Sequence, residues 1–276
     1  MSFAVIGDRG MFGTDMVGVL DSEEKPFTGF NRNSLDLNSS IDALSEQLQG
    51  FEVIINAVAY TAVDKAESEL EIANLVNGEY AGKLAQVAKS VGAKFMHIST
   101  DYVFDGFATS PYLTSTQPDP QSAYGASKLL GERLVAESGA NYTIFRTAWL
   151  YGRHGRCFPK VIFEKVLRKD SIKVVNDQFG QPTWTRDLAQ QVLAFAQLTE
   201  APKIVHAVSS GKASWLEFAQ EIVGGYPVEP VSSAEFVTVA TRPSYSVLEN
   251  SSDLVTPIGN WLERWEVAKV DVLAEI

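Results

Sequence analysis

Short apolar segments alternate with helical patterns along residues 1–150, and this alternation restricts the fold more than any other feature of the chain. Brief apolar runs bounded by glycine or polar residues are typical of buried strands, whereas longer stretches with apolar positions three and four apart are typical of helices. The alternation predicts an α/β fold, a doubly wound parallel sheet with helices on both faces. The predicted strands are 3–7, 25–30, 51–57, 94–99 and 142–146, and the predicted helices are 11–20, 39–50, 77–91 and one that begins near Tyr124.

The second half of the chain has a looser pattern. Helices are predicted at 158–169, 186–197 and 215–223, and short strands at 172–175 and 204–207. Ser39 and Asp42, like Ser214 and Glu217, have the spacing of a capping box at a helix start. We therefore expect residues 1–150 to form a Rossmann domain that binds a dinucleotide. Residues 151–276 are expected to form mainly a smaller substrate-binding lobe, and some of their segments can return to the first domain.

Composition excludes several classes of function. The net charge of −11 leaves no basic surplus for sequence-independent binding to nucleic acid. No apolar run reaches about 18 residues, so no membrane span is expected, and the N-terminus lacks the pattern of a signal peptide. Cys157 is the only cysteine, which rules out an internal disulfide and favours a reducing, cytoplasmic setting. His97 is expected to be a packed core residue, and the scattered histidines offer no zinc spacing.

A glycine-rich loop follows the first predicted strand. It reads GDRGMFG and places glycines at positions 7, 10 and 13. Such glycines let the backbone turn tightly and approach a pyrophosphate at a helix N-terminus, where free N–H groups favour anions. The spacing differs from GxGxxG, but its place between a strand and a helix predicts a dinucleotide site.

The end of the second predicted strand indicates which dinucleotide binds. An acidic residue there would hold the 2′-hydroxyl of NAD, but the chain reads TGFNRNS. Arg32 can pair with a 2′-phosphate through parallel hydrogen bonds. We therefore expect NADPH to be preferred, with NADH as the alternative, and Asp36 and Leu37 to lie where an adenine edge can be bound.

Candidate catalytic residues lie at the end of the fourth predicted strand and on the helix after it. Ser99, Thr100 and Asp101 follow the strand, and Tyr124 and Lys128 lie four residues apart, on the same helical face. A cation beside a phenol lowers its pKa, so Lys128 is expected to make Tyr124 a better acid. Reduction of a ketone needs a proton source and a hydrogen-bond donor at the carbonyl oxygen. Tyr124 and Thr100 can fill these two roles without a metal.

Five motifs give the chain its resemblance to a known family. They are INAVAYTAVDKAE (55–67), HISTDYVFDG (97–106), YGASKLLGE (124–132), RTAWLYG (146–152) and DQFGQPT (177–183). With them the chain resembles the dTDP-4-dehydrorhamnose reductases, which are extended short-chain dehydrogenase/reductases. The resemblance implies NADPH-dependent reduction of a 4-keto-6-deoxy nucleotide sugar, with Tyr124 as proton donor, Thr100 at the carbonyl and Lys128 supporting both.

The residues and the resemblance together give three groups of expected site residues. The expected cofactor contacts are Gly7, Arg9, Gly10, Met11, Phe12, Gly13, Asn31, Arg32, Asp36, Leu37, Ala57, Val58, Ala59, Tyr60, Ser99, Tyr124 and Lys128. The expected substrate contacts are Thr100, Asp101, Trp149, Gln178, Pro182, Thr183 and Arg242, the last for a diphosphate. The expected catalytic residues are Thr100, Tyr124 and Lys128.

Several alternatives stay open at this point. Some family members bind magnesium through glutamates at a dimer contact, but Arg186 falls at one such position, so no metal is expected here. Asp101 can serve a sugar hydroxyl or cap the following turn, and Trp215 is expected in the core. The stretch around Arg242 departs from the family pattern and leaves the sugar open. Competing functions are a reductase or epimerase of another nucleotide sugar and a non-catalytic regulatory subunit of methionine adenosyltransferase type. Either a monomer or a homodimer is compatible with the sequence.

Overall fold

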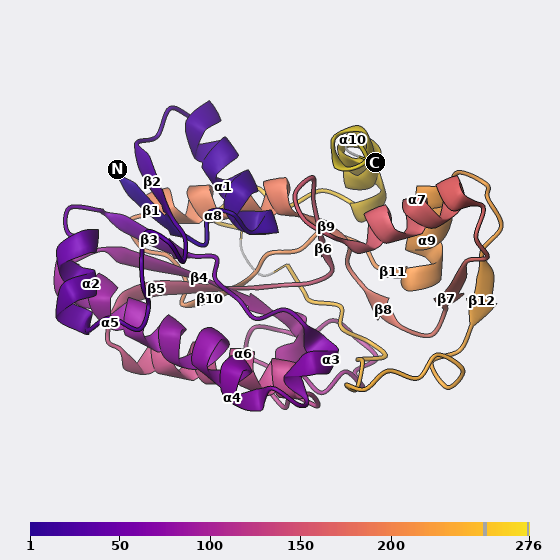
Figure 1. Cartoon of the computed structure of the whole chain (residues 1–276), viewed down its shortest axis with the longest axis horizontal. Coiled ribbons are helices and arrows are strands. Elements are labelled where there is room, and N and C mark those ends of the chain that lie inside the picture. The colour runs from indigo at the N-terminus through magenta and orange to yellow at the C-terminus, as the bar shows by residue number, and fades with distance from the viewer. Residues whose placement is uncertain (251–252, 275) are drawn as a thin grey trace.

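Six parallel strands form the central sheet of the computed structural model, which describes residues 1–250, 253–274 and 276 (Figure 1). In chain order they are β1 (Phe3–Ile6), β2 (Phe27–Phe30), β3 (Val53–Asn56), β4 (Lys94–Thr100), β5 (Asn141–Thr147) and β10 (Ile204–His206). Their spatial order is β10-β5-β4-β3-β1-β2, so the chain reverses direction across the sheet between β1 and β3. Ligands of doubly wound sheets bind at such a switch point. The predicted fold class is confirmed.

Helices cover both faces of this sheet because its strands are apolar on both sides. Phe3 and Val5 pack against α1 (Met11–Ser22) and α8 (Thr185–Gln197), whereas Ala4 and Ile6 face the opposite side. That side is covered by α2 (Ile41–Leu48), α5 (Tyr80–Val91) and α6 (Ala123–Glu137). Between β3 and α5 lie α3 (Val63–Ala66), α4 (Leu70–Ala73) and a π-helical turn, η1 (Asn74–Glu79).

The second lobe has a separate apolar core. Phe218 and Trp265 are completely buried in it, with their rings in edge-to-face contact at 5.5 Å. Figure 1 shows this lobe beside the carboxyl edge of the large sheet. Its helices are α7 (Phe158–Arg168), α9 (Trp215–Val223) and α10 (Trp261–Val272). Its strand pairs are β6 (Leu150–Tyr151) with β9 (Thr183–Trp184), β7 (Lys173–Val175) with β12 (Glu229–Val231), and β8 (Phe179–Gly180) with β11 (Ala213–Ser214).

Two segments of the C-terminal half return to the large sheet. Strand β10 pairs with β5 at its edge, and α8 packs against α1. None of the helices in the described part of the chain combines the length and apolar character required to span a bilayer.

Helix starts test the capping predictions directly. Ser214 and Glu217 form the predicted capping box, with hydrogen bonds in both directions. The first capping prediction is wrong by one residue: Ser40, not Ser39, caps α2, and its hydroxyl accepts from the backbone N–H of Ala43. Ser39 belongs to the turn before the helix, where its N–H donates to the Asp36 carbonyl oxygen at 3.0 Å.

Candidate active site

The glycine loop joins β1 to α1 at the switch point of the sheet. Gly7 has φ +93°, and a Cβ on it would lie 3.0 Å from the carbonyl carbon of Ala57 at the end of β3. A Cβ on Gly13 would lie 2.0 Å from the Gly7 carbonyl oxygen, so this glycine lets α1 pack against the loop. Gly10 begins α1 without a side-chain cap. The free amide groups of the first turn thus suit the pyrophosphate of a dinucleotide.

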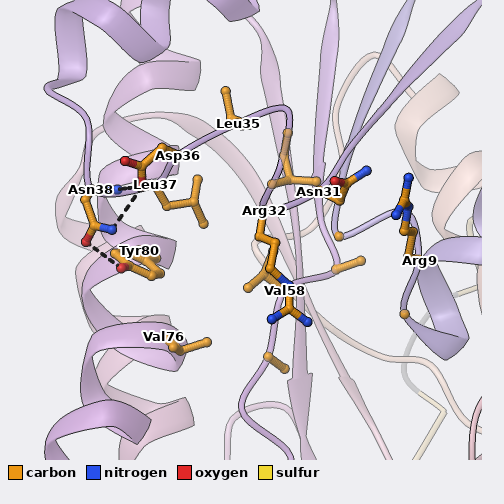
Figure 2. Close-up of a pocket in the computed structure, with 15 residues that line it drawn as sticks. Arg9, Asn31, Arg32, Leu35, Asp36, Leu37, Asn38, Val58, Val76 and Tyr80 are labelled. Carbon is orange, nitrogen blue, oxygen red and sulfur yellow. Dashed lines mark hydrogen bonds between the residues drawn. The ribbon is translucent and has the colours of Figure 1, made fainter.

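A first cavity of about 450 Å³ opens beside this loop, at the ends of β1, β2 and β3 (Figure 2). It brings together Arg9, Asn31, Arg32, Asp36 and Leu37, all expected at a cofactor. Figure 2 shows Tyr80 and Asn38 on one side, Arg9 on the other and Arg32 between them. Five lining residues were not among the expected site residues. They are Ile6, in the last position of β1, and Leu35, Asn38, Val76 and Tyr80, which belong to no glycine or strand-end motif.

The polar side of this cavity is held by a short hydrogen-bond chain. The Tyr80 hydroxyl donates to Asn38 Oδ1 at 2.7 Å, and Asn38 Nδ2 donates to Asp36 Oδ1 at 2.9 Å. Leu35 is buried, whereas the Arg9 and Arg32 side chains are exposed. The lining of the cavity thus combines apolar side chains, a hydrogen-bonded polar group and two exposed arginines.

A second cavity of about 640 Å³ continues from the first toward the second lobe. The two cavities share Gly10 and the segment 57–59, so together they form one elongated site. Further predicted residues that line the second cavity are Met11, Phe12, Ser99, Thr100, Asp101, Tyr124, Lys128 and Trp149. Lining residues that the sequence reasoning did not include are Thr61, Val63, Ile98, Tyr102, Thr147, Ala148, Leu150, Arg156 and Trp215.

Helix α6 delivers Tyr124 and Lys128 to this cavity from its first two turns. Ser122 caps the helix by accepting from the Gly125 N–H at 3.1 Å. A Cβ on Gly125 would lie only 2.2 Å from the Tyr102 carbonyl oxygen, so glycine permits the close approach of α6 to η2 (Asp101–Val103). Lys128 is 1% exposed, and its ammonium donates to the Ile98 carbonyl oxygen at 2.6 Å. The positions of Tyr124 and Lys128 are therefore fixed by the contact of α6 with η2 and the end of β4.

Burial dominates the protonation of these two groups. It raises the pKa of Tyr124 to about 12, although an interaction with Thr100 acts in the opposite direction. Burial also lowers the pKa of Lys128 to about 8, with Glu132 opposing the change. The expectation that Tyr124 has a lowered pKa is therefore wrong. The loss of water around the phenol and the nearby negative charge of Asp101 both raise the pKa of Tyr124, and the Lys128 ammonium is hydrogen-bonded to Ile98 instead.

The structure shows which residue caps the turn after β4: it is Thr100 and not Asp101. The Thr100 hydroxyl caps η2 by accepting from the Tyr102 N–H at 3.2 Å, and it donates to Asp101 Oδ1 at 2.9 Å. Asp101 is therefore not the cap. Its carboxyl group is 2% exposed, and burial raises its pKa to about 6.

Two indole rings form an aromatic wall of the second cavity. Trp149 and Trp215 stack with ring centroids 3.5 Å apart and an interplanar angle of 6°. Trp149 has a left-handed backbone, with φ +47°, and a Cβ on Gly180 would lie 2.4 Å from its ring. The expectation that Trp215 belongs to the core is right only in part: the ring is half-buried and packs against the core of the second lobe, but it also lines the cavity. The spacing of Trp215 and Phe218 placed both residues on one face of α9, but it could not show that Trp215 also lies at the cavity.

Other predicted residues do not line either cavity. Tyr60 donates its hydroxyl to Glu69, Gln178 donates to Ser233 at 2.9 Å, and Arg242 forms an ion pair with Asp64 at 2.9 Å.

Pro182 and Thr183 are buried in the joint between the lobes. The Thr183 hydroxyl donates to the Gln181 carbonyl oxygen at 3.1 Å and accepts from the Ser209 N–H at 3.2 Å. Gly13 serves the packing of α1. The predicted core position of His97 is confirmed: it is completely buried, and its Nδ1 lies 3.1 Å from Asn56 Nδ2.

Within residues 1–250, 253–274 and 276, no three histidine, cysteine, aspartate or glutamate side chains gather in a way that would hold a metal ion. Arg186 lies over the Trp184 ring at 5.9 Å.

Comparison with known proteins gives the same family from sequence and from structure. A family model described as "RmlD substrate binding domain" matches residues 1–276. A dTDP-4-dehydrorhamnose reductase from Burkholderia thailandensis is 40% identical over 237 residues, which cover 79% of each chain. A probable dTDP-4,6-dihydroxy-2-methyloxan-3-one 4-ketoreductase from Streptomyces antibioticus is 37% identical over 286 residues, which cover 99% of this chain and 96% of that one.

The crystal structure of a dTDP-4-dehydrorhamnose reductase from Bacillus anthracis in complex with NADP superimposes with a TM-score of 0.93. It is 33% identical, and the match covers 98% of this chain and 99% of that one. The resemblance inferred from the five motifs is thereby confirmed. The chain belongs to the RmlD family of dTDP-4-dehydrorhamnose reductases, NAD(P)-dependent oxidoreductases with a Rossmann-type fold.

Proposed function

We propose that this protein uses NADPH to reduce the 4-keto group of a dTDP-4-keto-6-deoxy sugar, as in the conversion of dTDP-4-dehydrorhamnose to dTDP-L-rhamnose. The observation that carries the proposal is the meeting of Thr100, Tyr124 and Lys128 in one cavity that continues from the glycine loop. The printed names of the B. thailandensis and S. antibioticus relatives support a dTDP-linked keto substrate.

The proposed chemistry assigns one role to each of the three residues. Bound NADPH would supply the hydride for the carbonyl carbon. Thr100 exchanges its hydrogen bond with Asp101 for one to the carbonyl oxygen, where negative charge develops. Tyr124 donates its phenolic proton to the same oxygen. Lys128, one helical turn away, stabilises the phenolate that remains.

A raised pKa at Tyr124 is compatible with this direction of reaction. A proton donor must carry its proton before hydride transfer, and a phenol with a pKa of about 12 is fully protonated at neutral pH. The sugar alkoxide is more basic than a phenolate, so the proton moves downhill once the alkoxide forms. After the proton transfer the site must stabilise the Tyr124 phenolate, and the ammonium of Lys128, one helical turn away, can do so.

The preference for NADPH rests on the end of β2. Asn31 and Arg32 occupy the place where an NAD site would have a carboxylate, and the exposed Arg32 guanidinium faces the first cavity. Arginine binds phosphate groups through two parallel hydrogen bonds. The NADP in the B. anthracis structure supports the same assignment.

The division of labour between the two lobes is also a proposal. Residues 1–150 hold mainly the cofactor, and residues 151–276 hold mainly the nucleotide sugar. We propose a cytoplasmic enzyme that acts as a monomer or homodimer.

A second candidate is reduction of a related sugar nucleotide. A relative from Streptomyces niveus, named dTDP-4-keto-6-deoxy-D-glucose reductase, is 37% identical over 93% of this chain. Dehydration is disfavoured, because Tyr102 follows Asp101 where an elimination site would need a second acid.

Turnover of a panel of 4-keto nucleotide sugars, followed by loss of NADPH absorbance, tests the proposal. Tyr124→Phe should lower kcat by at least about 100-fold, the lower range for loss of a general acid, and leave the Kd of NADPH within about twofold. A wild-type protein that reduces none of the sugars, or a Tyr124→Phe variant with normal kcat, would refute it.

A further inference from the structure

Arg156 is a charged residue of the second cavity that has no role in the proposed reaction. Three of its lining residues carry full charges at neutral pH or near it: Asp101, Lys128 and Arg156. Lys128 is buried and bonded to Ile98, and Asp101 is bonded to Thr100. The Arg156 side chain is exposed, and no ion pair holds it in the part of the chain that the structure describes.

The loop that carries Arg156 is held in place by its other residues. Between β6 and α7, Arg153 pairs with Asp271 on α10 at 3.2 Å, and His154 Nε2 lies 4.0 Å from Asp15 on α1. The Cys157 thiol, on the far side of Arg156, donates to the Gly152 carbonyl oxygen at 3.6 Å. These contacts anchor the loop to both lobes, and they leave the exposed Arg156 among the residues that line the second cavity.

The position of the loop identifies the part of the site that Arg156 can reach. A Cβ on Gly155 would lie 3.8 Å from Met11 Cβ, so the loop passes over the start of α1. Arg156 lines only the second cavity, together with the Trp149–Trp215 wall, and does not line the first. It therefore serves the half of the elongated site that lies beyond the cofactor end.

Arg242 is a poor candidate for the same task. Its guanidinium pairs with Asp64 Oδ2 at 2.9 Å, and Asp64 Oδ1 also accepts from the Ala240 N–H at 3.0 Å. Asp64 thereby neutralises Arg242 and ties its loop to α3. A diphosphate would have to compete with this carboxylate.

We propose that Arg156 binds the diphosphate of the nucleotide-sugar substrate, an inference that rests on the proposed function. A diphosphate entering a protein of net charge −11 needs a local cation, and a guanidinium binds two phosphate oxygens at once. The cofactor also carries a diphosphate, but that group is expected at Gly10 and the segment 57–59, which line both cavities, whereas Arg156 lines only the second. The sugar diphosphate lies instead against the loop of Arg156, with the sugar ring toward Tyr124.

Binding of dTDP to the NADP-loaded protein, measured by calorimetry, tests this assignment without turnover. Loss of a charge-assisted hydrogen-bond pair corresponds to about a 10- to 100-fold rise in Kd. Arg156→Gln should raise the Kd of dTDP by this factor, and Arg156→Lys should recover part of it. In both variants the Kd of NADPH should stay within about twofold. Arg168→Gln is the matched control, since it removes an exposed guanidinium of α7 that lines neither of the two cavities, and its dTDP affinity should be unchanged.

Three outcomes would overturn the assignment. A wild-type Kd for dTDP in Arg156→Gln would show that the diphosphate lies elsewhere. An equal loss of NADPH affinity would assign Arg156 to the cofactor, and an equal effect of Arg168→Gln would make the loss one of overall charge. The proposed function fails separately, when the wild-type protein binds dTDP but reduces no 4-keto sugar.

Discussion

Replacing Lys128 with methionine should make the protein more stable at neutral pH while it removes catalysis. Lys128 is 1% exposed, and burial lowers its pKa from 10.5 to about 8. At pH 7 the native protein must therefore keep a charged ammonium in surroundings that disfavour the charge. Methionine has similar length and no charge, so it fills the same space without this cost.

The size of the effect follows from the pKa difference. A fall from 10.5 to about 8 corresponds to about 3 kcal/mol of lost native stability below pH 8, at about 1.4 kcal/mol per pKa unit. The substitution also deletes the hydrogen bond from Lys128 to Ile98, which contributes about 1 kcal/mol. The net gain for Lys128→Met at pH 7 is then about 2 kcal/mol.

The pH dependence distinguishes this cause from a simple packing effect. Between pH 8 and 10.5 the unfolded chain binds a proton on Lys128 that the native protein has released, so wild-type stability rises with pH in this window. The variant lacks that rise. The stability advantage of the variant should therefore shrink above pH 8. It should reach zero at about pH 10, where the remaining gain from removing the buried charge equals the loss of the hydrogen bond to Ile98.

Urea unfolding of both proteins at several pH values measures the difference directly. Lys89→Met, at an exposed position on α5, is the control and should show no such pH-dependent difference. A Lys128→Met variant that is less stable than wild type at pH 7, or whose advantage does not change between pH 7 and 10, would refute the argument that the buried charge costs stability.

Three further predictions concern other parts of the site. Asp101→Asn should stabilise the protein at pH 7 by up to about 3 kcal/mol, because burial raises the pKa of this carboxyl from 3.8 to about 6. In urea unfolding this gain in stability should shrink below pH 6 and vanish below about pH 4, and a gain that does not change with pH would show that the buried carboxylate charge is not its cause. Gly180→Ala should displace the Trp149 ring, since the added methyl would lie 2.4 Å from it. We expect a loss of about 1–3 kcal/mol in unfolding free energy and a raised KM for the sugar nucleotide. If neither value changes, the ring moves away from the methyl group without cost. Arg32→Ala should raise the KM of NADPH about tenfold or more with little change in that of NADH, as measured by steady-state kinetics; equal effects on the two cofactors would remove Arg32 from the 2′-phosphate.

The catalytic region thus contains two ionisable groups whose charged forms are disfavoured by burial. Asp101 and Lys128 line the same cavity, and both pKa values are shifted toward neutral pH. Strong shifts of this kind are typical of functional sites. Apolar packing on both faces of the sheet compensates for the stability lost at these two positions. Phe3, Met16 and Phe95 are completely buried there.

Features that lie within one element could be predicted from the sequence because helix and strand geometry fix them. Tyr124 and Lys128 had to share a face of α6, since residues four apart on a helix always do. Gly7, Thr100 and Trp149 were expected at the sheet edge, because each follows an apolar strand whose carboxyl end lies there. The order of strands and helices likewise determined the fold class.

Contacts between distant segments were decided only by the tertiary structure. Nothing local in the sequence pairs Arg242 with Asp64, stacks Trp215 on Trp149 or turns the Thr183 hydroxyl toward Ser209. The pKa of Tyr124 is the clearest case: its cationic neighbour can be read from a four-residue spacing, but the water it loses depends on everything packed around it. A spacing along the chain specifies which groups are neighbours, whereas desolvation is a property of the whole folded molecule.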